Sequence, residues 1–499
     1  MNQIKFGSII SILNLLLNIF AGLIITRLMV IKLGTSEYGV YILVASLVSY
    51  VSIFDFGLHQ TIFRFISKFR AQKSSNLQSI FLATILLIYL LITILIVIVG
   101  FFFYFNIDTI LSDNFSVFEI QVAKNLIPIH FLNLIFSLVL GSFQFVLNGY
   151  GLFIISYSIN FIKSLLRHLF FILFLFIGFK SFNLSLVDLS LSITIGLIYT
   201  FYVFFSLKIS INFTYLKIQN FIEVISFSLY GFLISIVNQF FWNFSQLILA
   251  LLAKPTEIVF YSISTTFVIY FQLISLTLSG FFLPRISIMV HAGSSSKDYT
   301  DLLIKVGRFQ LSMLGLFLIG FIFLGKPFII LWLGNEFQNV YYIILIIIIP
   351  LTIPMIQTTS EDIIKAKNLQ AFKTLLYIFM VLFNAFLSIF LYTFLGSFAI
   401  AISTSISIVL FQCLIMNIYY SKKLGINILR FFKQVFKGIL GSFLITIFFS
   451  LITLLFPTNT FLIFIIKAFF ITSVYLVCFL LLGFNGFEKT TLKSLFKLK

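Results

Sequence analysis

Long apolar segments alternate with short polar gaps along the whole chain of 499 residues. Each segment can cross a hydrocarbon core of about 30 Å, which takes roughly 20 helical residues. Several are longer than this and are expected to tilt. The pattern predicts an all-α integral membrane protein with about 14 transmembrane helices, near residues 8–31, 38–62, 78–104, 122–147, 151–179, 184–207, 221–252, 257–283, 306–325, 340–360, 374–394, 396–420, 438–456 and 460–483.

The basic residues are distributed unevenly between the gaps. Of the 32 Lys and Arg residues, 23 lie at the N-terminus, in every second gap or in the C-terminal tail. The other gaps and the span ends beside them hold only Lys32, Lys124, Lys180, Lys254 and Lys326, and the interiors of the spans contain Arg27, Lys163, Arg167 and Lys467. Because basic loops stay on the cytoplasmic side, we expect a multi-pass protein of the cytoplasmic (inner) membrane with both termini in the cytoplasm.

Composition supports this class and excludes others. The chain is 61% hydrophobic and 9% charged, with a mean hydropathy of +1.18, which is far from a soluble domain. A net charge of +18 could suggest nucleic acid, but the charge lies in short loops beside an anionic leaflet, so we expect no nucleic-acid partner. Cys413 and Cys478 lie in apolar spans, so no disulfide framework, metal cluster or cofactor is expected.

No gap is long enough for a soluble domain. The largest outer connection covers only residues 105–121. The inner gaps after the second, eighth and twelfth spans are basic and look amphipathic; residues 63–70 alternate rings and cations, which suits a segment in the headgroup plane. Chemistry must therefore take place within the membrane or at its faces, so we expect no catalytic residues and no enzyme activity.

A repeat is visible at an offset of 220 residues. Glu37 and Tyr41 at the start of the second span match Glu257 and Tyr261 at the start of the eighth. An even number of helices per copy gives both copies the same topology. We therefore expect two pseudo-symmetric six-helix lobes, residues 1–218 and 219–437, followed by two helices and a basic cytoplasmic tail at residues 438–499. A substrate would lie between the lobes near the bilayer midplane.

The fifth span carries a polar stripe. Ser156, Asn160, Lys163 and Arg167 recur at helical spacing and share one face. A cation at this depth costs roughly 2.5–3.5 kcal/mol, and the span contains no acid to pair with either one. The stripe therefore predicts a cationic lumen that receives an anion, the alternative being structural hydrogen bonds to neighbouring carbonyls or snorkelling. His168 points elsewhere and is expected to be packed.

Other spans carry amides that could line the same cavity. Asn14 and Asn18 in the first span suit close helix packing and cavity lining equally well, and Arg27 near the outer end could reach the lumen or snorkel. The remaining candidate lining residues are Asn238, Trp242 and Gln246 in the seventh span and Gln272 in the eighth. So many amides in lipid-embedded helices suggest a lining compatible with sugars. Lys467, in the last span, fits a snorkelling residue.

Acidic residues are almost absent from the spans, and Asp55, toward the inner end of the second, is the clearest case, with His59 one turn further on. Asp55 could cap the following segment or pair with Arg64. Alternatively, Asp55 and His59 could serve ion coupling or inner gating.

Several stretches, in this order, resemble a known family. Residues 27–41, then Asp55-Phe56-Gly57-Leu58 followed by Arg64, look like the N-terminal signature of oligosaccharide-lipid flippases. These are the Wzx-type O-antigen and capsule translocases of the multidrug/oligosaccharidyl-lipid/polysaccharide exporter superfamily. Residues 283–287, 331–337, and Asn384 with 396–401, are similar to later loops and hairpins of that family. Where many relatives have an acid in the seventh helix, this chain has Ser245-Gln246.

The resemblance implies a two-lobed fold of 14 helices and an undecaprenyl-pyrophosphate-linked oligosaccharide as cargo. It also implies membrane lipids, the polysaccharide polymerase and the chain-length machinery as partners. Cations such as Lys163 and Arg167 could hold the pyrophosphate in a lumen of low dielectric constant, while one lobe rocks against the other. The chain has no phosphate-binding loop ending in Lys-Ser/Thr, so an ion gradient is the expected energy source.

Three alternatives stay open at this point. A lipid II-type flippase would share the fold and the charge of the cargo. A multidrug exporter of the same superfamily would share the fold, but its cationic cargo calls for buried acids. A membrane glycosyltransferase or polymerase would need a sizeable outer loop, which this chain lacks.

Overall fold

The computed structural model describes residues 2–214, 218–280, 282–367 and 369–484, and this part of the chain is helical, without β-strands. The predicted all-α class is therefore confirmed. The chain divides into two compact units, Met1–Val259 and Phe260–Lys499. Each unit has its own core of buried aliphatic and aromatic side chains.

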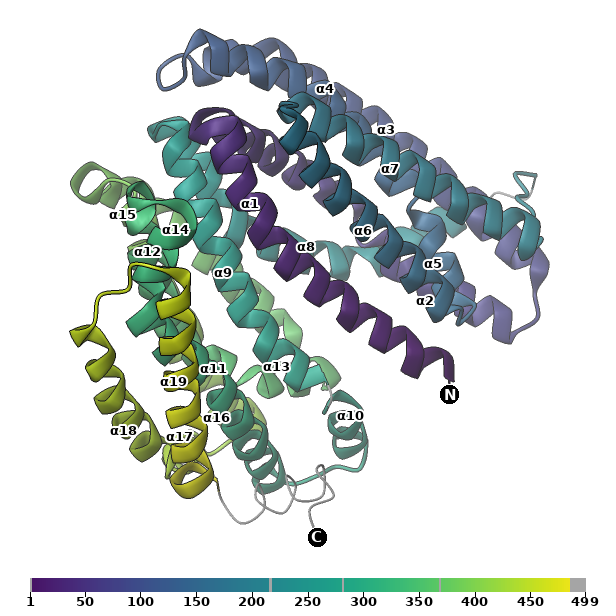
Figure 1. Ribbon diagram of the computed structural model, residues 1–499. Coiled ribbons are helices and arrows are strands. Elements are labelled where there is room, and N and C mark those ends of the chain that lie inside the picture. Colours follow the sequence, from purple (N-terminus) through teal and green to yellow (C-terminus); the bar gives the residue numbers. More distant parts are fainter. Residues whose placement is uncertain (1, 215–217, 281, 368, 485–499) are drawn as a thin grey trace. The chain divides into compact units, whose positions relative to one another are not determined.

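The first unit is built around a long N-terminal helix. α1 packs along α6 and α4, α4 packs against α3 and α7, and α8 contacts α1, α2 and α3 (Figure 1). Its elements are α1 (Asn2–Val51), η1 (Ser52–Asp55), α2 (Leu58–Ala71), α3 (Ser75–Leu111), α4 (Val117–Val139), α5 (Ser142–Gly149), α6 (Phe153–Ile177), α7 (Ser181–Phe201), η2 (Tyr202–Ser206) and α8 (Ile218–Leu252). α1 is kinked at Gly34 (φ 81°, ψ 163°), a conformation that a residue with a Cβ rarely adopts.

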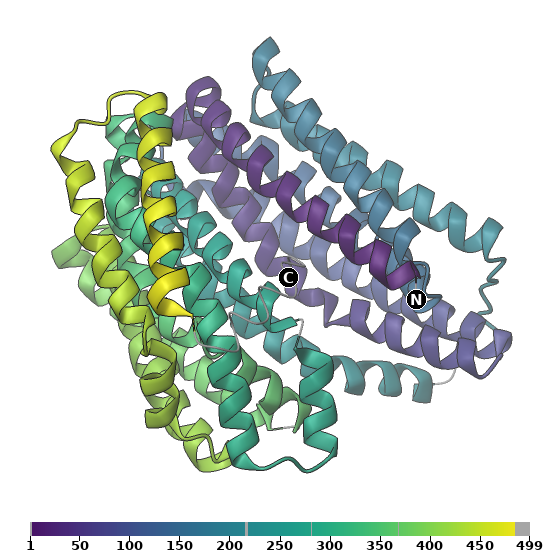
Figure 2. The same ribbon diagram turned by 60° about the horizontal axis from the view of Figure 1, so that its bottom comes forward.

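In the second unit, α14 and α15 form one hairpin and α18 and α19 another, and α19 lies beside α11 (Figure 2). Its elements are α9 (Pro255–Gly280, which begins in the first unit), α10 (Leu283–His291), α11 (Ser296–Leu333), η3 (Asn335–Phe337), α12 (Gln338–Met355), α13 (Thr358–Ala366), α14 (Gln370–Leu395), α15 (Phe398–Ser407), η4 (Ile408–Ile415), α16 (Met416–Leu424), α17 (Ile428–Phe436), α18 (Ile439–Ile452), η5 (Thr453–Leu455), α19 (Phe461–Cys478) and η6 (Phe479–Gly483).

Among the described residues, 11 helices are long and apolar enough to cross a membrane, or 12 with the bent pair Ile428–Phe436 and Ile439–Leu455. One of the 11, Phe6–Ala71, contains the first two predicted spans, which are joined through Gly34. The seventh predicted span falls on α8, of which only Gln239–Leu252 enters this comparison. These two features account for the difference from the predicted number, and every predicted span lies on a helix.

The short helices between spans are amphipathic. On α2, Ile62, Phe65 and Ile66 are buried while Arg64 and Lys68 lie on the accessible side, as the alternation of rings and cations predicts. On α17, Phe431 and Val435 are buried and Lys433 is exposed. Both helices therefore combine an apolar face with a basic one, which suits the boundary between headgroups and acyl chains.

The predicted lobe boundary at residues 218 and 219 separates the copies of the repeat, whereas contacts group α8 with the first unit, up to Val259. The assignment of residues to lobes stays a prediction. In the predicted C-terminal segment, residues 485–499 lie outside the described residues.

Candidate functional site

The polar stripe of α6 faces α7. Arg167 donates from Nε to Asp188 Oδ1 at 2.6 Å and from Nη2 to Asp188 Oδ2 at 3.2 Å. Lys163 Nζ donates to Ser192 Oγ at 3.2 Å. Ser156 is fully buried, and its carbonyl accepts from Tyr199 Oη at 3.1 Å. These three contacts follow one another along the antiparallel helices α6 and α7. All three lie on the one face of α6 that the spacing predicts.

Asp188 is a further acid within the predicted spans. It lies inside the predicted span 184–207, whereas Asp55 was expected to be the clearest acid within the spans. The partner of Arg167 comes from the next helix, so an acid-free fifth span does not leave the guanidinium unpaired. The face predicted to line an open lumen is in large part a contact between two helices.

The cluster retains a positive charge. Arg167 and Lys163 bring two cations, and Asp188 brings one carboxylate, which also accepts from Tyr41 Oη at 3.4 Å. The guanidinium carbon of Arg167 lies 4.4 Å from the centroid of the Phe171 ring, within the range of a cation–π contact. The side chain of Arg167 keeps 36% of its surface accessible and that of Asp188 16%. The described helices therefore leave part of the pair uncovered.

One amide of α1, Asn18, contacts α6 at His168. Asn18 Nδ2 donates to the carbonyl of Asn14 at 2.7 Å, and Asn18 Oδ1 lies 3.0 Å from His168 Nε2. His168 is buried and contacts Asn18 of α1, in line with the predicted packed position. For Asn18 this contact favours helix packing over cavity lining, whereas the role of Asn14 stays a prediction. Arg27 is half-buried further along α1.

A series of polar and aromatic contacts runs from Asp188 to the start of α7. The ring of Tyr41 meets the ring of His130 edge-on at 5.3 Å, and His130 Nε2 lies 2.9 Å from Ser185 Oγ. Ser181 donates to Glu37 Oε1 from its backbone N at 2.8 Å and from its hydroxyl at 2.6 Å. The Glu37 carboxylate therefore caps the N-terminus of α7, where helix dipoles favour negative charge. The sequence marks Tyr41 and Glu37 as repeat positions, without these roles.

Asp55 and His59 lie at a break in the second span. Asp55 ends η1, and the next two residues, Phe56 and Gly57, have left-handed backbone angles (φ 52° and 73°). Asp55 accepts from Tyr89 Oη at 2.9 Å and lies 3.4 Å from His59 Nδ1. The His59 ring stacks on Phe145 at 4.3 Å. The pair is therefore tied to α3 and α5 at a helix break, and the predicted role in gating or ion coupling stays a prediction.

The other predicted lining residues are placed as follows. Asn160 is half-buried on α6, Gln246 is buried on α8, and Gln272 is half-buried on α9 in the second unit. The side chains of Asn238 and Trp242 lie outside the described residues. The sugar-compatible lining therefore stays a prediction.

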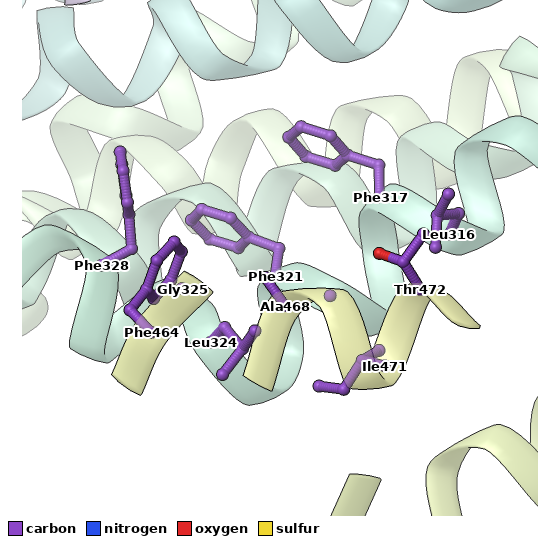
Figure 3. A pocket seen from close by; sticks show the side chains of 11 residues that line it. Leu316, Phe317, Phe321, Leu324, Gly325, Phe328, Phe464, Ala468, Ile471 and Thr472 are labelled. Carbon is purple, nitrogen blue, oxygen red and sulfur yellow. The ribbon is translucent and has the colours of Figure 1, made fainter. Parts of the chain in front are cut away.

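The second unit has an apolar groove between α11 and α19 (Figure 3). Its volume is about 220 Å³, and its walls include Phe317, Phe321, Phe328 and Phe464. Space opens beside Gly320, where a Cβ would meet no other atom within 4 Å. Thr472 brings a hydroxyl to a lining that is otherwise apolar. A groove of this kind suits hydrocarbon and excludes a charged headgroup.

No protein-family model and no curated protein sequence matches this chain. Solved structures do. A lipid II flippase MurJ in an inward closed conformation is similar over 95% of this chain and 97% of its own, at TM-score 0.74 and 18% identity. An inward-facing multidrug resistance MATE family transporter of the MOP superfamily is similar over 81% and 95%, at TM-score 0.67 and 12% identity. The MATE multidrug transporter DinF-BH is similar over 85% and 96%, at TM-score 0.61 and 11% identity. This chain therefore has the fold that the lipid II flippase MurJ shares with the MATE transporters of the MOP superfamily.

Proposed function

We propose that this protein is a flippase that moves undecaprenyl-pyrophosphate-linked oligosaccharide repeat units from the cytoplasmic to the outer leaflet of the inner membrane. Such units serve the synthesis of O-antigen, capsule or a related surface polysaccharide, and a polymerase with its chain-length machinery would take them over. The fold, which it shares with flippases and exporters, supports a transport role, and the order of its sequence motifs supports this cargo.

The charge of the α6–α7 cluster carries the proposal. Arg167 is held by the carboxylate of Asp188 in a two-point contact, which is also the geometry in which a guanidinium binds a phosphate. A diphosphate bears more charge than a carboxylate, and Lys163 stands one turn away on the same face. The diphosphate could therefore replace Asp188 as the partner of Arg167, with Lys163 as the second cation.

The remaining steps follow from the chemistry of a lipid-linked sugar. Its diphosphate cannot cross hydrocarbon alone, whereas its polyprenyl tail can stay in lipid throughout. Amide and hydroxyl side chains such as Asn160 and Gln246 would meet the glycan. Rocking of one half of the molecule against the other would expose the cargo to each side in turn, and an ion gradient would supply the energy.

Gene deletion combined with a leaflet assay tests this function. Without the protein, the surface polysaccharide should be lost and its lipid-linked repeat unit should accumulate facing the cytoplasm. Proteoliposomes should expose the labelled lipid to an external glycosidase only when the protein is present. A polymerase or ligase defect would instead leave the unit on the outer face, so finding it there in the deletion strain would contradict the proposal.

The role of the cluster can be tested with matched variants. Arg167→Ala and Lys163→Ala should each abolish most export while the protein still inserts and accumulates, and Arg167→Lys should retain part of it because charge without the two-point contact remains. Arg430 provides the control, because it also forms an arginine–aspartate pair, with Asp301 at 2.6 Å and 40% exposed. Arg430→Ala should leave export unchanged. Full export by the Lys163→Ala/Arg167→Ala double variant would assign both residues to structure.

The second candidate is a lipid II-type flippase, favoured by the similarity to MurJ. This cargo has the same diphosphate and tail but fewer sugars. Measuring which lipid-linked saccharide accumulates after depletion decides between the two. A multidrug exporter is the less favoured alternative, because the described α6–α7 cluster offers more cations than acids to a cationic drug.

We also propose the predicted orientation, with both termini in the cytoplasm. Reporter fusions after Asn114 and Lys326 should report an external location, and fusions after Lys73 and Lys297 an internal one. Reversal of either pair would overturn the orientation.

A further inference from the structure

α17 is a short helix that departs from the direction of the helix after it. It runs from Ile428 to Phe436 and meets the following apolar helix at an angle of 44°. Gly438, between the two, has a left-handed backbone (φ 79°), which favours glycine. A Cβ at Gly438 would also lie 2.5 Å from the carbonyl oxygen of Leu482. The bend therefore turns α17 away from the path of α18, as a helix at the membrane surface requires.

One face of α17 is fixed to the second unit. Phe431 and Val435 are buried, and the ring of Phe431 packs so closely on α11 that a Cβ at Gly307 would lie 3.0 Å from it. Asn427 caps the helix, since its Oδ1 accepts from the backbone N of Arg430 at 2.9 Å. The helix is thus held in one orientation, and its remaining surface is presented to the surroundings.

The accessible side of α17 combines large apolar side chains with cations. Leu429 is 85% exposed, and the half-buried rings of Phe432 and Phe436 stack with their centroids 6.4 Å apart. Lys433 and Lys437 are both exposed and lie one turn apart. Water suits these cations but not the leucine, whereas a purely apolar neighbour suits the leucine but not the cations. A phospholipid offers both an acyl chain and a charged headgroup.

The helix that packs against α17 carries acids that are already engaged. α11 has two carboxylates in its first two turns. Asp301 accepts from Nη2 of Arg430 at 2.6 Å. Asp298 accepts from the backbone N of Ser295 at 2.9 Å and from its hydroxyl at 2.7 Å. Asp301 therefore neutralises one cation of α17, and Asp298 belongs to the capping box of α11.

The two lysines of α17 keep their charge without an acidic partner. Among the described residues, neither Lys433 nor Lys437 forms a salt bridge. Lys422 and Lys423, at the end of α16, are exposed as well and add to the positive potential. The proposed orientation places this gap at the cytoplasmic leaflet, which carries acidic lipids. We propose that α17 binds an acidic phospholipid of that leaflet, with the headgroup at Lys433 and Lys437 and an acyl chain against Leu429.

α2 is a comparable helix whose cations are engaged within the protein. It also combines buried rings with exposed basic residues. Lys68 Nζ, however, lies 5.5 Å from the ring centroid of Phe65 and 5.7 Å from that of Phe69, and the guanidinium carbon of Arg70 lies 5.2 Å from the ring centroid of Tyr150. Cation–π contacts already satisfy part of these charges. Acidic lipid is therefore expected at α17, and α2 supplies the control.

A tryptophan beside the lysines can report which lipid lies there. Leu429→Trp changes a side chain that is 85% exposed, so the full-length protein should still fold and can be reconstituted into vesicles of phosphatidylcholine and phosphatidylglycerol. Either lipid, when brominated on its acyl chains, quenches a tryptophan that it contacts. After subtraction of the parent protein's signal, brominated phosphatidylglycerol should quench about 10-fold or more effectively per lipid than brominated phosphatidylcholine. High salt should shrink this preference.

Lysine variants in the Leu429→Trp background test the headgroup contact. Lys433→Gln and Lys437→Gln should each lower the preference for phosphatidylglycerol about 5-fold, and folding should persist because both side chains are exposed. Lys68→Gln on α2 should leave the preference unchanged. Equal quenching by the two lipids with all lysines present would overturn the site. Quenching by neither lipid would also overturn it, and would leave water or an acidic protein partner beside α17.

This site goes beyond the proposed function and does not rest on it, because the bound phospholipid is not the cargo. In vesicles with the same lipids in both leaflets, the measured preference is also independent of the orientation of the protein. If the preference is found but export fails the leaflet assay, the site stands and the proposed function fails. If export proceeds without a preference for acidic lipid, the function stands and the site fails.

Discussion

The two units satisfy the cations on their long helices in different ways. In the first, Arg167 and Lys163 contact side chains, the Asp188 carboxylate and the Ser192 hydroxyl. In the second, Arg308 donates to the carbonyls of Gln434, Lys437 and Gly483 at 2.5–2.8 Å. Lys467 donates to the carbonyls of Thr453 and Phe456 and to the hydroxyl of Thr458 at 2.5–2.7 Å.

This difference distinguishes cations that could bind a ligand from cations that stabilise the fold. The carbonyls around Arg308 and Lys467 belong to helix ends, which cannot move away without losing the packing of those ends. A carboxylate on a side chain can rotate away when a stronger anion arrives. Of these cations, those of the α6–α7 cluster therefore have the properties of an exchangeable anion site.

The corresponding tyrosines show the same contrast. Tyr41 donates to Asp188 at 3.4 Å, whereas Tyr261, which lies 220 residues later, is 3.5 Å from the hydroxyl of Thr404. Each contact joins the first turns of a predicted span, the second or the eighth, to the last span of the same predicted lobe. At this place the first unit has a charged partner and the second a neutral one, so the contrast in charge between the two units extends to these tyrosines.

The largest effect is expected at Arg308. Arg308→Met removes the donor from several helix-terminal carbonyls and should lower the free energy of unfolding by about 3–4 kcal/mol. Unfolding in detergent measures it, and Lys433→Met, an exposed change on α17, is the control. A loss of stability no greater than that of the control would show that these carbonyls have hydrogen-bond donors without the arginine. The two units would then not differ in how they satisfy their cations.

Lys467→Met should lower the free energy of unfolding less than Arg308→Met does, by about 2–3 kcal/mol, because it leaves two carbonyls without a donor. Thr458→Val removes only one of the three contacts and should cost about 1 kcal/mol or less. The protein that does accumulate should export normally. If the Lys467→Met protein is stable but does not export, Lys467 takes part in transport and does not only stabilise the fold.

At the α6–α7 cluster, Asp188→Ala should cost about 2 kcal/mol, below the roughly 3–5 kcal/mol of fully buried pairs, because Arg167 is partly exposed. Arg167→Met/Asp188→Leu should recover most of this loss, since removing both charges leaves neither unpaired. The double-mutant cycle is read from denaturant unfolding. Additive losses would mean that the two side chains do not depend on one another, contrary to an exchangeable pair.

The smallest effect is expected at the tyrosines. Tyr41→Phe and Tyr261→Phe each remove one long hydrogen bond and should each cost less than about 1 kcal/mol. Tyr41→Phe should cost slightly more, because its partner is charged. Thermal unfolding of the two variants, measured side by side, gives the comparison. A larger loss of stability for Tyr261→Phe than for Tyr41→Phe would contradict the stronger, charged contact expected in the first unit.

Hydropathy and charge predict the helices well because each depends on nearby residues alone. A segment must be apolar along its own length to cross lipid, and the predicted spans accordingly fall on helices. The shared face of Ser156, Lys163 and Arg167 follows from helical spacing for the same reason. The sequence favours snorkelling for Lys467, whereas in the structure its ammonium is buried and donates to the carbonyls of Thr453 and Phe456. Carbonyls at helix ends carry no signal in the sequence.

The class of the protein, the positions of its spans and the sign of the charge placed within them follow from the amino-acid sequence alone. Which of these charges are neutralised, and by which groups, depends on the tertiary structure. Asp188 meets Arg167 because α6 and α7 run antiparallel with a particular rotation about their axes, and Gln310 meets Thr358 because α12 breaks where it does. Such contacts depend on the packing of helices against one another, which helical periodicity within a single segment does not encode.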